Sequence, residues 1–123
     1  MSTDVQRSLK LVEPYLDALD REIDAVAEYL PQAGAKVRTI YIGGGTPTTL
    51  TAPQLDRLIS HLRRKLDLSR LVEFTVEAGR PDTITAEKMA VLHDLEVDRV
   101  SVNPQSMRDE VLKACLLYTS RCV

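Results

Sequence analysis

Helical and strand-like patterns alternate along this chain, and the alternation limits the folds that it can adopt. The predicted helices, in which apolar residues recur every three or four positions, are residues 11–30, 52–66 and 86–95. Residues 107–114 resemble the beginning of another helix. Short β-branched segments form the predicted strands, residues 37–42, 71–77 and 98–103. Strands that alternate with helices pair in parallel through right-handed crossovers, so we expect an α/β fold.

Length, charge and hydropathy exclude several classes of protein. The 123 residues fit one domain, and 44% hydrophobic with 28% charged residues is typical of a globular chain. A net charge of −2 without a basic stripe, together with 4% aromatic residues, argues against a nucleic-acid partner. No apolar run is long enough to cross a membrane, and residues 1–16 lack the apolar core of a signal peptide. We therefore expect a cytoplasmic protein without a membrane partner.

Three consecutive glycines, Gly43 to Gly45, end the first predicted strand within the segment TIYIGGGTPTTL. Thr51 and Gln54 then form a capping-box pattern that predicts the start of the next helix. Glycines after a strand serve either as a tight turn or as a ligand loop, and the loop alone leaves both interpretations open. The segment contains neither GK[ST] nor G-x-G-x-x-G, so a phosphate ligand is disfavoured.

The second and third predicted strands each have one apolar and one polar face. In the second strand the apolar face is Val72, Phe74 and Val76, and the polar face is Glu73, Thr75 and Glu77. In the third strand Val100 and Val102 alternate with Arg99, Ser101 and Asn103. Covered parallel strands are normally apolar on both faces, so these polar faces indicate a cleft for a polar ligand. The carboxyl ends of the strands, where such folds bind ligands, carry the glycine loop, Glu77 and residues 103–105.

From the residues alone, the roles of the candidate site residues stay open. Glu77 is a ligand-binding carboxylate, a solvated strand-end carboxylate or a partner of Arg80, and Gln105 by itself indicates little. His61 and His93 lie within predicted helices without a carboxylate or cysteine constellation, so we interpret both as structural. The sequence contains no recognisable Ser-His-Asp or Cys-His arrangement.

Taken together, three segments resemble the radical S-adenosylmethionine (SAM) enzymes, specifically the oxygen-independent coproporphyrinogen III oxidase (coproporphyrinogen dehydrogenase) family. These segments are YIGGGTPTTLTAPQLDRL, VEFTVEAGRPDTIT and DRVSVNPQSMRDEVLKA, in the family's order and spacing. The resemblance extends from about residue 9 to Ala114. It implies a partial (β/α)₆ barrel, to which this chain would contribute about three parallel strands with alternating helices.

The resemblance also implies a chemistry and a set of site residues. In the family a [4Fe-4S] cluster reduces SAM, and the resulting 5′-deoxyadenosyl radical takes hydrogen from the propionates of coproporphyrinogen III. These side chains decarboxylate, which yields protoporphyrinogen IX for haem synthesis. The implied partners are therefore coproporphyrinogen III and an electron donor for the cluster. By resemblance Gly44, Gly45 and Thr46 lie against the amino and carboxylate groups of SAM, and Glu77 and Gln105 match a cofactor-binding glutamate and glutamine.

Two departures from the family pattern shape our expectations. The family's C-x3-C-x2-C cluster motif is absent, and the cysteines present, Cys115 and Cys122, match no metal motif, so we expect no metal ligands in this chain. The family pattern breaks after Ala114, and Leu117 stands where the family has a cofactor-binding arginine. We therefore expect residues 1–114 to be part of a radical SAM barrel and residues 115–123 to be a tail foreign to the family. The chain alone is expected to be an inactive internal fragment.

Two other functions remain open. A haem-chaperone-type relative would bind haem instead of decarboxylating coproporphyrinogen. A small α/β binding module would carry out no redox chemistry. Sequence outside the resemblance would separate the enzyme from the chaperone, whereas independent folding and ligand binding by this chain would favour the binding module.

Overall fold

The computed structural model describes residues 10–104 and 106–114. Its elements, in chain order, are α2 (Val12–Gln32), β1 (Thr39–Ile42), the 3-10 helix η1 (Pro47–Thr49), α3 (Ala52–Lys65), β2 (Glu73–Ala78), the 3-10 helix η2 (Pro81–Thr83), α4 (Ala86–Asp94), β3 (Arg99–Val102) and α5 (Asp109–Ala114). The predicted helices and strands are all present, with ends shifted by at most two residues. The 3-10 helices were not predicted. Gln105 and the predicted tail, residues 115–123, lie outside the described residues.

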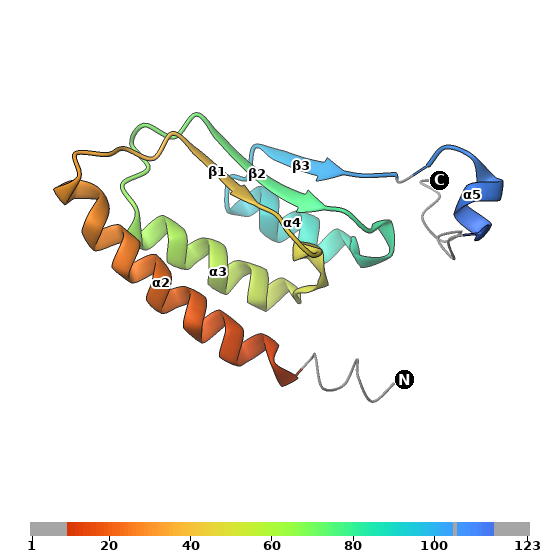
Figure 1. The fold of residues 1–123 in the computed structure, drawn as a ribbon, viewed down its shortest axis with the longest axis horizontal. Coiled ribbons are helices and arrows are strands. Elements are labelled where there is room, and N and C mark those ends of the chain that lie inside the picture. The colour runs from red at the N-terminus through yellow and green to blue at the C-terminus, as the bar shows by residue number, and fades with distance from the viewer. Residues whose placement is uncertain (1–9, 105, 115–123) are drawn as a thin grey trace.

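The described strands form a parallel sheet in the order β1–β2–β3, which confirms the predicted α/β fold (Figure 1). In its register Ile40 lies beside Phe74, and Val76 lies beside Val100. Because the strands point in one direction, the segments that follow them meet at one edge of the sheet (Figure 1). These segments are the glycine loop, the loop after β2 and the residues that lead to α5.

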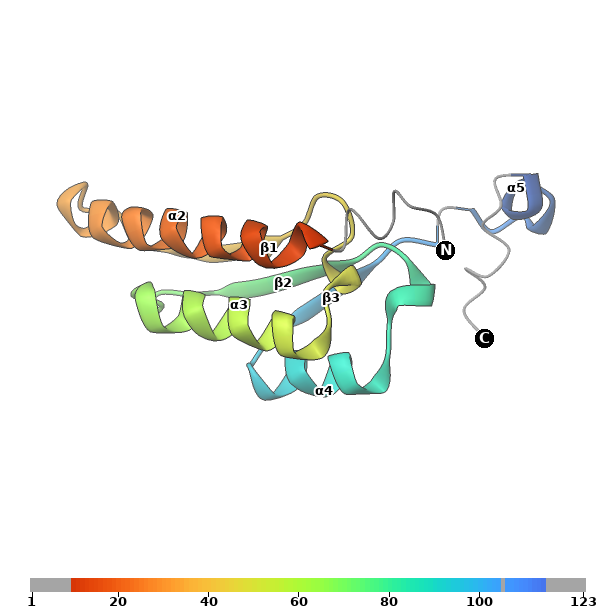
Figure 2. The same cartoon turned by 90° about the horizontal axis from the view of Figure 1, so that it is seen from below.

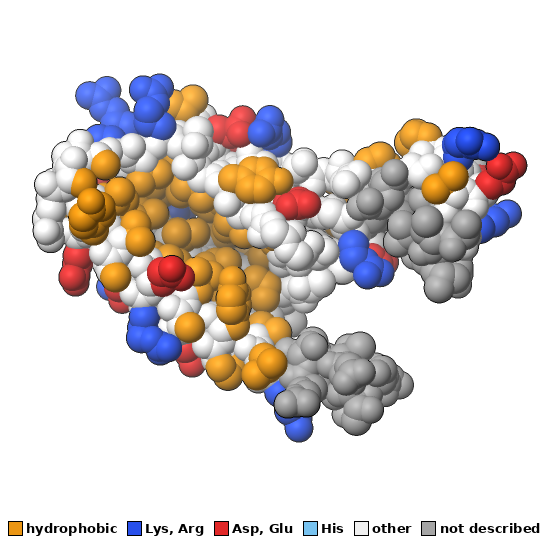
Figure 3. Space-filling view, in the orientation of Figure 1, with side chains coloured by type: hydrophobic (Ala, Val, Ile, Leu, Met, Phe, Trp, Pro, Cys, Tyr) orange, Lys and Arg blue, Asp and Glu red, His pale blue; other side chains and the backbone are white. Residues whose placement is uncertain are grey.

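The helices α2, α3 and α4 lie on the same side of the sheet (Figure 2). Ile59 of α3 and Leu92 of α4 pack against Phe74 and Val76 of β2, and these four side chains are buried. The helix α2 adds a second apolar cluster with α3, formed by Leu16, Ile23 and Leu58. Hydrophobic side chains also gather on the visible flank of α2 and in the hollow beside it (Figure 3). The covered face of the sheet is thus the apolar face that the alternation predicts.

Two residues that alternation assigns to the apolar face are nevertheless exposed. Val72 is 65% exposed and Val102 is 43% exposed. Val72 precedes the first residue of β2, and Val102 is the last residue of β3. Both residues therefore lie at the margin of the packed layer, where the pleat still alternates but less of the sheet is covered.

The opposite face of the sheet is polar, and no described helix covers it. Its residues are Thr39, Tyr41, Glu73, Thr75, Glu77, Arg99 and Ser101. Arg99 donates to Glu73 Oε1 at 2.8 Å and to Thr75 Oγ1 at 3.2 Å, and the Thr75 hydroxyl donates to Glu73 Oε1 at 2.8 Å. This network buries Thr75 completely at the amino-terminal part of the face. The carboxylate of Glu77 lies two residues further along the same face.

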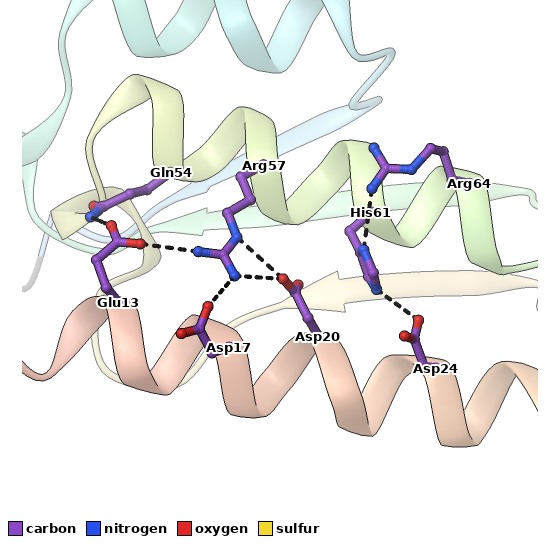
Figure 4. Close-up of polar contacts among 8 residues, drawn as sticks. All are labelled: Glu13, Asp17, Asp20, Asp24, Gln54, Arg57, His61 and Arg64. Atoms are coloured by element: carbon purple, nitrogen blue, oxygen red, sulfur yellow. Dashed lines mark hydrogen bonds and ion pairs between the residues drawn. The ribbon is translucent and has the colours of Figure 1, made fainter.

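Polar contacts join α2 to α3 along the outer side of the helix pair (Figure 4). Arg57 donates to Asp17 at 2.5 Å, to Asp20 at 2.7 Å and to Glu13 at 3.0 Å. The hydrogen bonds to Asp17 and then Asp20 raise the pKa of Arg57 above its already high value. Arg57 thus remains charged at any pH at which the fold exists, and the carboxylates of α2 have a fixed cationic partner.

His61 continues this interface one turn further along α3 (Figure 4). Its Nε2 lies 2.9 Å from Asp24 Oδ1, and Arg64 donates to its Nδ1 at 3.2 Å. Because arginine can only donate, Nδ1 is the acceptor and Nε2 carries the hydrogen that Asp24 accepts. These contacts support the interpretation of His61 as structural, and His93 is an exposed residue of α4.

The helix α3 begins with the capping box that its sequence predicts. Gln54 N–H donates to Thr51 Oγ1 at 3.4 Å, and Thr51 N–H donates to Gln54 Oε1 at 3.0 Å, which is the predicted capping box. Gln54 also donates to Glu13 of α2 at 2.6 Å.

Among the described residues, no helix combines the length and the apolar character that crossing a membrane requires.

Phe74→Ala is expected to lower the free energy of unfolding by about 3–5 kcal/mol, because it empties the centre of the sheet–helix layer. Val72→Ala is the matched control, since Val72 precedes Phe74 by two residues and faces the same side of the sheet but is 65% exposed. Its effect is expected to stay within about 0.5 kcal/mol. Urea unfolding followed by circular dichroism measures both changes. Equal losses in the two variants would contradict this description of the core.

Candidate functional site

The candidate site lies at the carboxyl edge of the sheet, where the glycine loop approaches Glu77. A methyl group placed on Gly43 would lie 3.0 Å from Glu77 Oε2, so the carboxylate is directed toward the loop. Glu77 pairs with Ser101 of β3 in the sheet register, and its backbone position is therefore fixed by β2. The structure thus brings together two of the sequence-predicted candidates, Glu77 and the glycine loop, from segments more than thirty residues apart.

Each of the three glycines has a different structural setting. At Gly43 a Cβ atom would lie 2.2 Å from Tyr41 Cε1, so a side chain there would displace the tyrosine ring. Gly44 has φ of 91°, a conformation that residues with a side chain rarely adopt. A Cβ atom on Gly45 would meet no described atom within 4 Å, so this glycine borders open space. The first two glycines are required by the fold of the loop itself, and the third leaves room beside it.

Tyr41 is a site residue that the sequence analysis missed. Its hydroxyl donates to Glu77 Oε2 at 3.3 Å, and its ring occupies the space that Gly43 leaves free. Desolvation, followed by the negative charge of Glu77, raises the pKa of Tyr41 above its usual value. Alternation along the sequence was a usable signal for Tyr41. It places Tyr41 on the polar face of β1, beside Thr75 of the parallel strand β2.

The alternative partner considered for Glu77 is occupied elsewhere. Arg80 donates to Asp82 through Nε at 3.1 Å and through Nη2 at 3.0 Å. The partner that the structure records for the Glu77 carboxylate is Tyr41. Glu77 is half-buried, and it therefore retains a surface that a ligand can reach.

Thr46 anchors the end of the glycine loop. Its carbonyl accepts the Thr49 N–H at 2.9 Å and the Thr49 hydroxyl at 2.7 Å, which closes the first turn of η1. Asn103, which follows β3 at the same edge of the sheet, is exposed. Gln105, the remaining sequence-predicted candidate, lies outside the described residues, and its role stays a prediction.

An apolar groove borders the other part of the glycine loop. It lies between α2, β1 and η1, in the region where Figure 3 shows hydrophobic side chains gathered beside α2, and has a volume of about 400 Å³. The lining residues are Leu11, Val12, Tyr15, Leu19, Ile42, Gly43, Gly45, Thr46, Pro47, Thr49, Leu50 and Leu58. The glycine loop therefore contacts both a carboxylate, at Glu77, and an apolar surface.

Comparison with known proteins identifies a family that matches most of the chain. The model of the radical SAM superfamily matches residues 9–121. The oxygen-independent coproporphyrinogen-III oxidase-like protein HemZ of Bacillus subtilis is 47% identical over 111 residues, which are 89% of this chain and 22% of that protein. These matches confirm the predicted resemblance to radical SAM proteins of the coproporphyrinogen oxidase type.

Other relatives have names that indicate different functions. The heme chaperone HemW of Bacillus subtilis is 40% identical over 104 residues, 83% of this chain and 26% of that protein. Anaerobic coproporphyrinogen III oxidase 1 of Cereibacter sphaeroides is 31% identical over 108 residues, 88% of this chain and 24% of that protein. The chain thus spans about a quarter of the length of these relatives. No solved structure matches it significantly.

Glu77→Gln is expected to lower the pKa of Tyr41 toward its usual value while leaving part of the shift in place. The reason is that desolvation is the larger cause of the raised pKa and the carboxylate charge is the second. Tyrosinate absorbance followed against pH measures the pKa, and Tyr41→Phe identifies the contribution of Tyr41 among the four tyrosines. The neutral phenol of Tyr41 donates the hydrogen bond to Glu77. The contribution of this hydrogen bond to the stability of the fold is therefore complete below the usual tyrosine pKa. It disappears as the pH rises through the raised pKa of Tyr41.

The distant exchange Glu13→Gln, which also removes one negative charge, is the control for this titration. It is expected to leave the Tyr41 pKa unchanged, since Glu13 contacts Arg57 and Gln54 on α3. An identical Tyr41 pKa in wild type and Glu77→Gln would show that the Tyr41–Glu77 contact is absent in solution.

Proposed function

Because this chain belongs to the radical SAM superfamily, we propose that it forms the SAM-binding part of a longer radical SAM protein that acts on tetrapyrroles. The observation that carries the proposal is the approach of the Glu77 carboxylate to the glycine loop at the carboxyl edge of a parallel sheet. The haem-related and porphyrin-related names of the relatives support the class of substrate. The proposal concerns a whole protein of which the described residues are one part.

The donors and acceptors at the site fit the chemical groups of SAM. Its amino and carboxylate groups need carbonyl and N–H partners, which the backbone of Gly44, Gly45 and Thr46 can supply. Thr46 would contribute its N–H, because its carbonyl already accepts two hydrogen bonds. Glu77 offers a carboxylate that can accept hydrogen bonds from an ammonium or hydroxyl group, and Tyr41 orients that carboxylate. The open space beside Gly45 admits a ligand against the backbone. In the bound state SAM would supply the carbon radical that removes a hydrogen atom from the substrate.

The same residues do not fit an iron–sulfur cluster. Within residues 10–104 and 106–114, no group of three or more histidine, cysteine, aspartate or glutamate residues could hold a metal ion. The whole chain has two cysteines, whereas the family motif uses three thiolates. We therefore assign no cluster ligand to this chain. In the proposed whole protein, the cluster and its electron donor would act from residues outside the part described.

Oxidative decarboxylation of coproporphyrinogen III to protoporphyrinogen IX is the reaction we propose for the whole protein. The names of the relatives from Bacillus subtilis and Cereibacter sphaeroides at 47% and 31% identity support it. The uncovered polar face of the sheet also supports it, because a few polar groups beside the cofactor can fix the orientation of a polar substrate. A haem-binding chaperone is the second candidate, favoured by the 40% identity to the heme chaperone HemW of Bacillus subtilis.

Anaerobic incubation of the full-length protein with coproporphyrinogen III, SAM and a reductant distinguishes the two candidates. The enzyme hypothesis predicts formation of protoporphyrinogen IX together with 5′-deoxyadenosine, both measured by chromatography. The chaperone hypothesis predicts stoichiometric binding of haem with no loss of propionates from coproporphyrinogen. Turnover without decarboxylation, or neither turnover nor haem binding, would contradict both assignments.

Glu77→Ala is expected to weaken SAM binding about 10- to 100-fold in the full-length protein. A hydrogen bond to a charged group contributes about 1.5–3 kcal/mol, and ~1.4 kcal/mol corresponds to about tenfold in affinity. Anaerobic calorimetry measures the affinity, and the visible absorption of the cluster should stay unchanged. Additional SAM should partly restore activity, because the loss concerns binding.

Glu73→Ala is the matched control for this variant. Glu73 lies on the same face of β2 but at its amino end, where it accepts hydrogen bonds from Arg99 and Thr75. Its replacement is expected to reduce stability and to leave SAM affinity close to that of the wild type. Equal SAM affinity in wild type and Glu77→Ala would refute the assignment of Glu77.

A further inference from the structure

Three residues join the glycine loop to the loop after β2. Thr48 Oγ1 lies 2.6 Å from Thr83 Oγ1, and Lys88 Nζ donates to the Thr48 carbonyl at 2.6 Å and to the Thr83 carbonyl at 3.0 Å. Thr48 is completely buried, and Lys88 and Thr83 are half-buried. We call Thr48, Thr83 and Lys88 the loop clasp.

The clasp connects the two segments that carry the proposed SAM contacts. Thr48 belongs to η1, which begins directly after Thr46, and Thr83 belongs to η2, which follows Glu77 and the end of β2. Lys88 stands in the first turn of α4, where its N–H donates to the capping residue Thr85 at 3.3 Å. The ammonium group therefore reaches both loops from a helix that is packed on the sheet.

The hydrogen-bond directions in the clasp follow from the neighbouring contacts. The Thr83 hydroxyl donates its single hydrogen to the Arg80 carbonyl at 2.7 Å. Thr83 Oγ1 is then the acceptor in the contact with Thr48, and the buried Thr48 hydroxyl is the donor. An ammonium group has three hydrogens, and Lys88 directs two of them at the carbonyls of Thr48 and Thr83. Both carbonyls lie outside the strands of the sheet.

The exposed middle of the glycine loop has no side-chain packing that would hold it in place. Gly44 and Gly45 have no side chains, and a Cβ atom on either would meet no described atom within 4 Å. The three clasp residues join the two loops through hydrogen bonds and not through the apolar clusters of the layers. The clasp is therefore placed to determine the separation of the two loops more than the stability of the layers beneath them.

We propose that the loop clasp is a positioning element that holds the glycine loop against Glu77 before SAM binds. The proposal rests on the proposed function in taking SAM as the ligand. Loops held in their bound arrangement lose less conformational freedom on binding, so the affinity is higher than it would be for free loops. Lys88 is a positioning residue in this account, because it acts on SAM through the backbone of the two loops.

Lys88→Met in the full-length protein tests the proposal. The variant keeps a long apolar side chain but removes the donor to both carbonyls, and SAM affinity is expected to fall about tenfold. Lys88→Arg is expected to restore most of the affinity, since a guanidinium group can donate to two carbonyls. Thr48→Val, which keeps the shape of the side chain, is a second variant that should also weaken binding.

Lys36→Met is the matched control. It removes a surface ion pair with Asp67 at 2.6 Å, between residues that are more than half exposed. It is expected to leave SAM affinity unchanged. Anaerobic calorimetry gives the affinity of the folded molecules, and thermal unfolding of the SAM-free proteins gives their stability, so a loss of affinity is separated from a loss of folded protein.

Amide hydrogen exchange of the SAM-free protein is the second measurement. Residues 43–49 and 79–83 should exchange faster in Lys88→Met and Thr48→Val than in the wild type, while α2 and α3 exchange as before. If the wild type binds no SAM, the proposed function fails, and faster exchange of the two loops in the variants alone supports the clasp. Wild-type SAM affinity in both variants, or unchanged exchange of both loops, overturns the proposal.

Discussion

The packing of α3 and α4 against one face of the parallel sheet is the interaction on which the rest of the structure depends. It places Phe74 and Val76 beneath the helices and leaves the alternate side chains of the same strand on the open face. The same pleat that buries Val76 therefore presents Glu77 to the outside, one residue further along β2. Because the strands are parallel, Glu77 then lies at the same edge of the sheet as the glycine loop that follows β1.

The arrangement of the layers could be predicted from the sequence because it depends on local periodicity. Spacing of three and four residues identified the helices, and alternation assigned Phe74 and Glu77 to opposite faces of β2. Alternation does not reveal that Val72 and Val102 are exposed, because it describes the direction of a side chain and contains no information about where the covering helices end. Capping at Thr51 was equally local and equally predictable.

Alternation can place Tyr41 on the polar face, but the contacts that complete the site could not be predicted from the sequence, for a physical reason. The Tyr41–Glu77 hydrogen bond joins residues 36 positions apart, and the Lys88–Thr48 contact joins residues 40 positions apart. Both depend on the sheet register and on the short helices η1 and η2, which leave no periodic signal. The reason for Gly43 is local instead, because the atom that excludes a side chain there belongs to the ring of Tyr41, two residues earlier.

The three glycines therefore combine structural and functional requirements within one loop. Gly43 accommodates the tyrosine that orients Glu77, and Gly44 permits a backbone conformation that turns the chain. In the proposed function, Gly45 leaves the space in which SAM approaches the backbone. The loop thus links the apolar groove beside α2 to the polar face of the sheet.

A crystal structure of the full-length protein with bound S-adenosylhomocysteine, a redox-inert analogue of SAM, tests the central claim most directly. The account predicts that the amino and carboxylate groups of the analogue contact the backbone of residues 44–46. It also predicts that the Glu77 carboxylate lies within hydrogen-bond distance of the ligand, with Tyr41 still bound to it. An analogue bound away from the glycine loop, or a Glu77 side chain that makes no contact with it, would contradict the account.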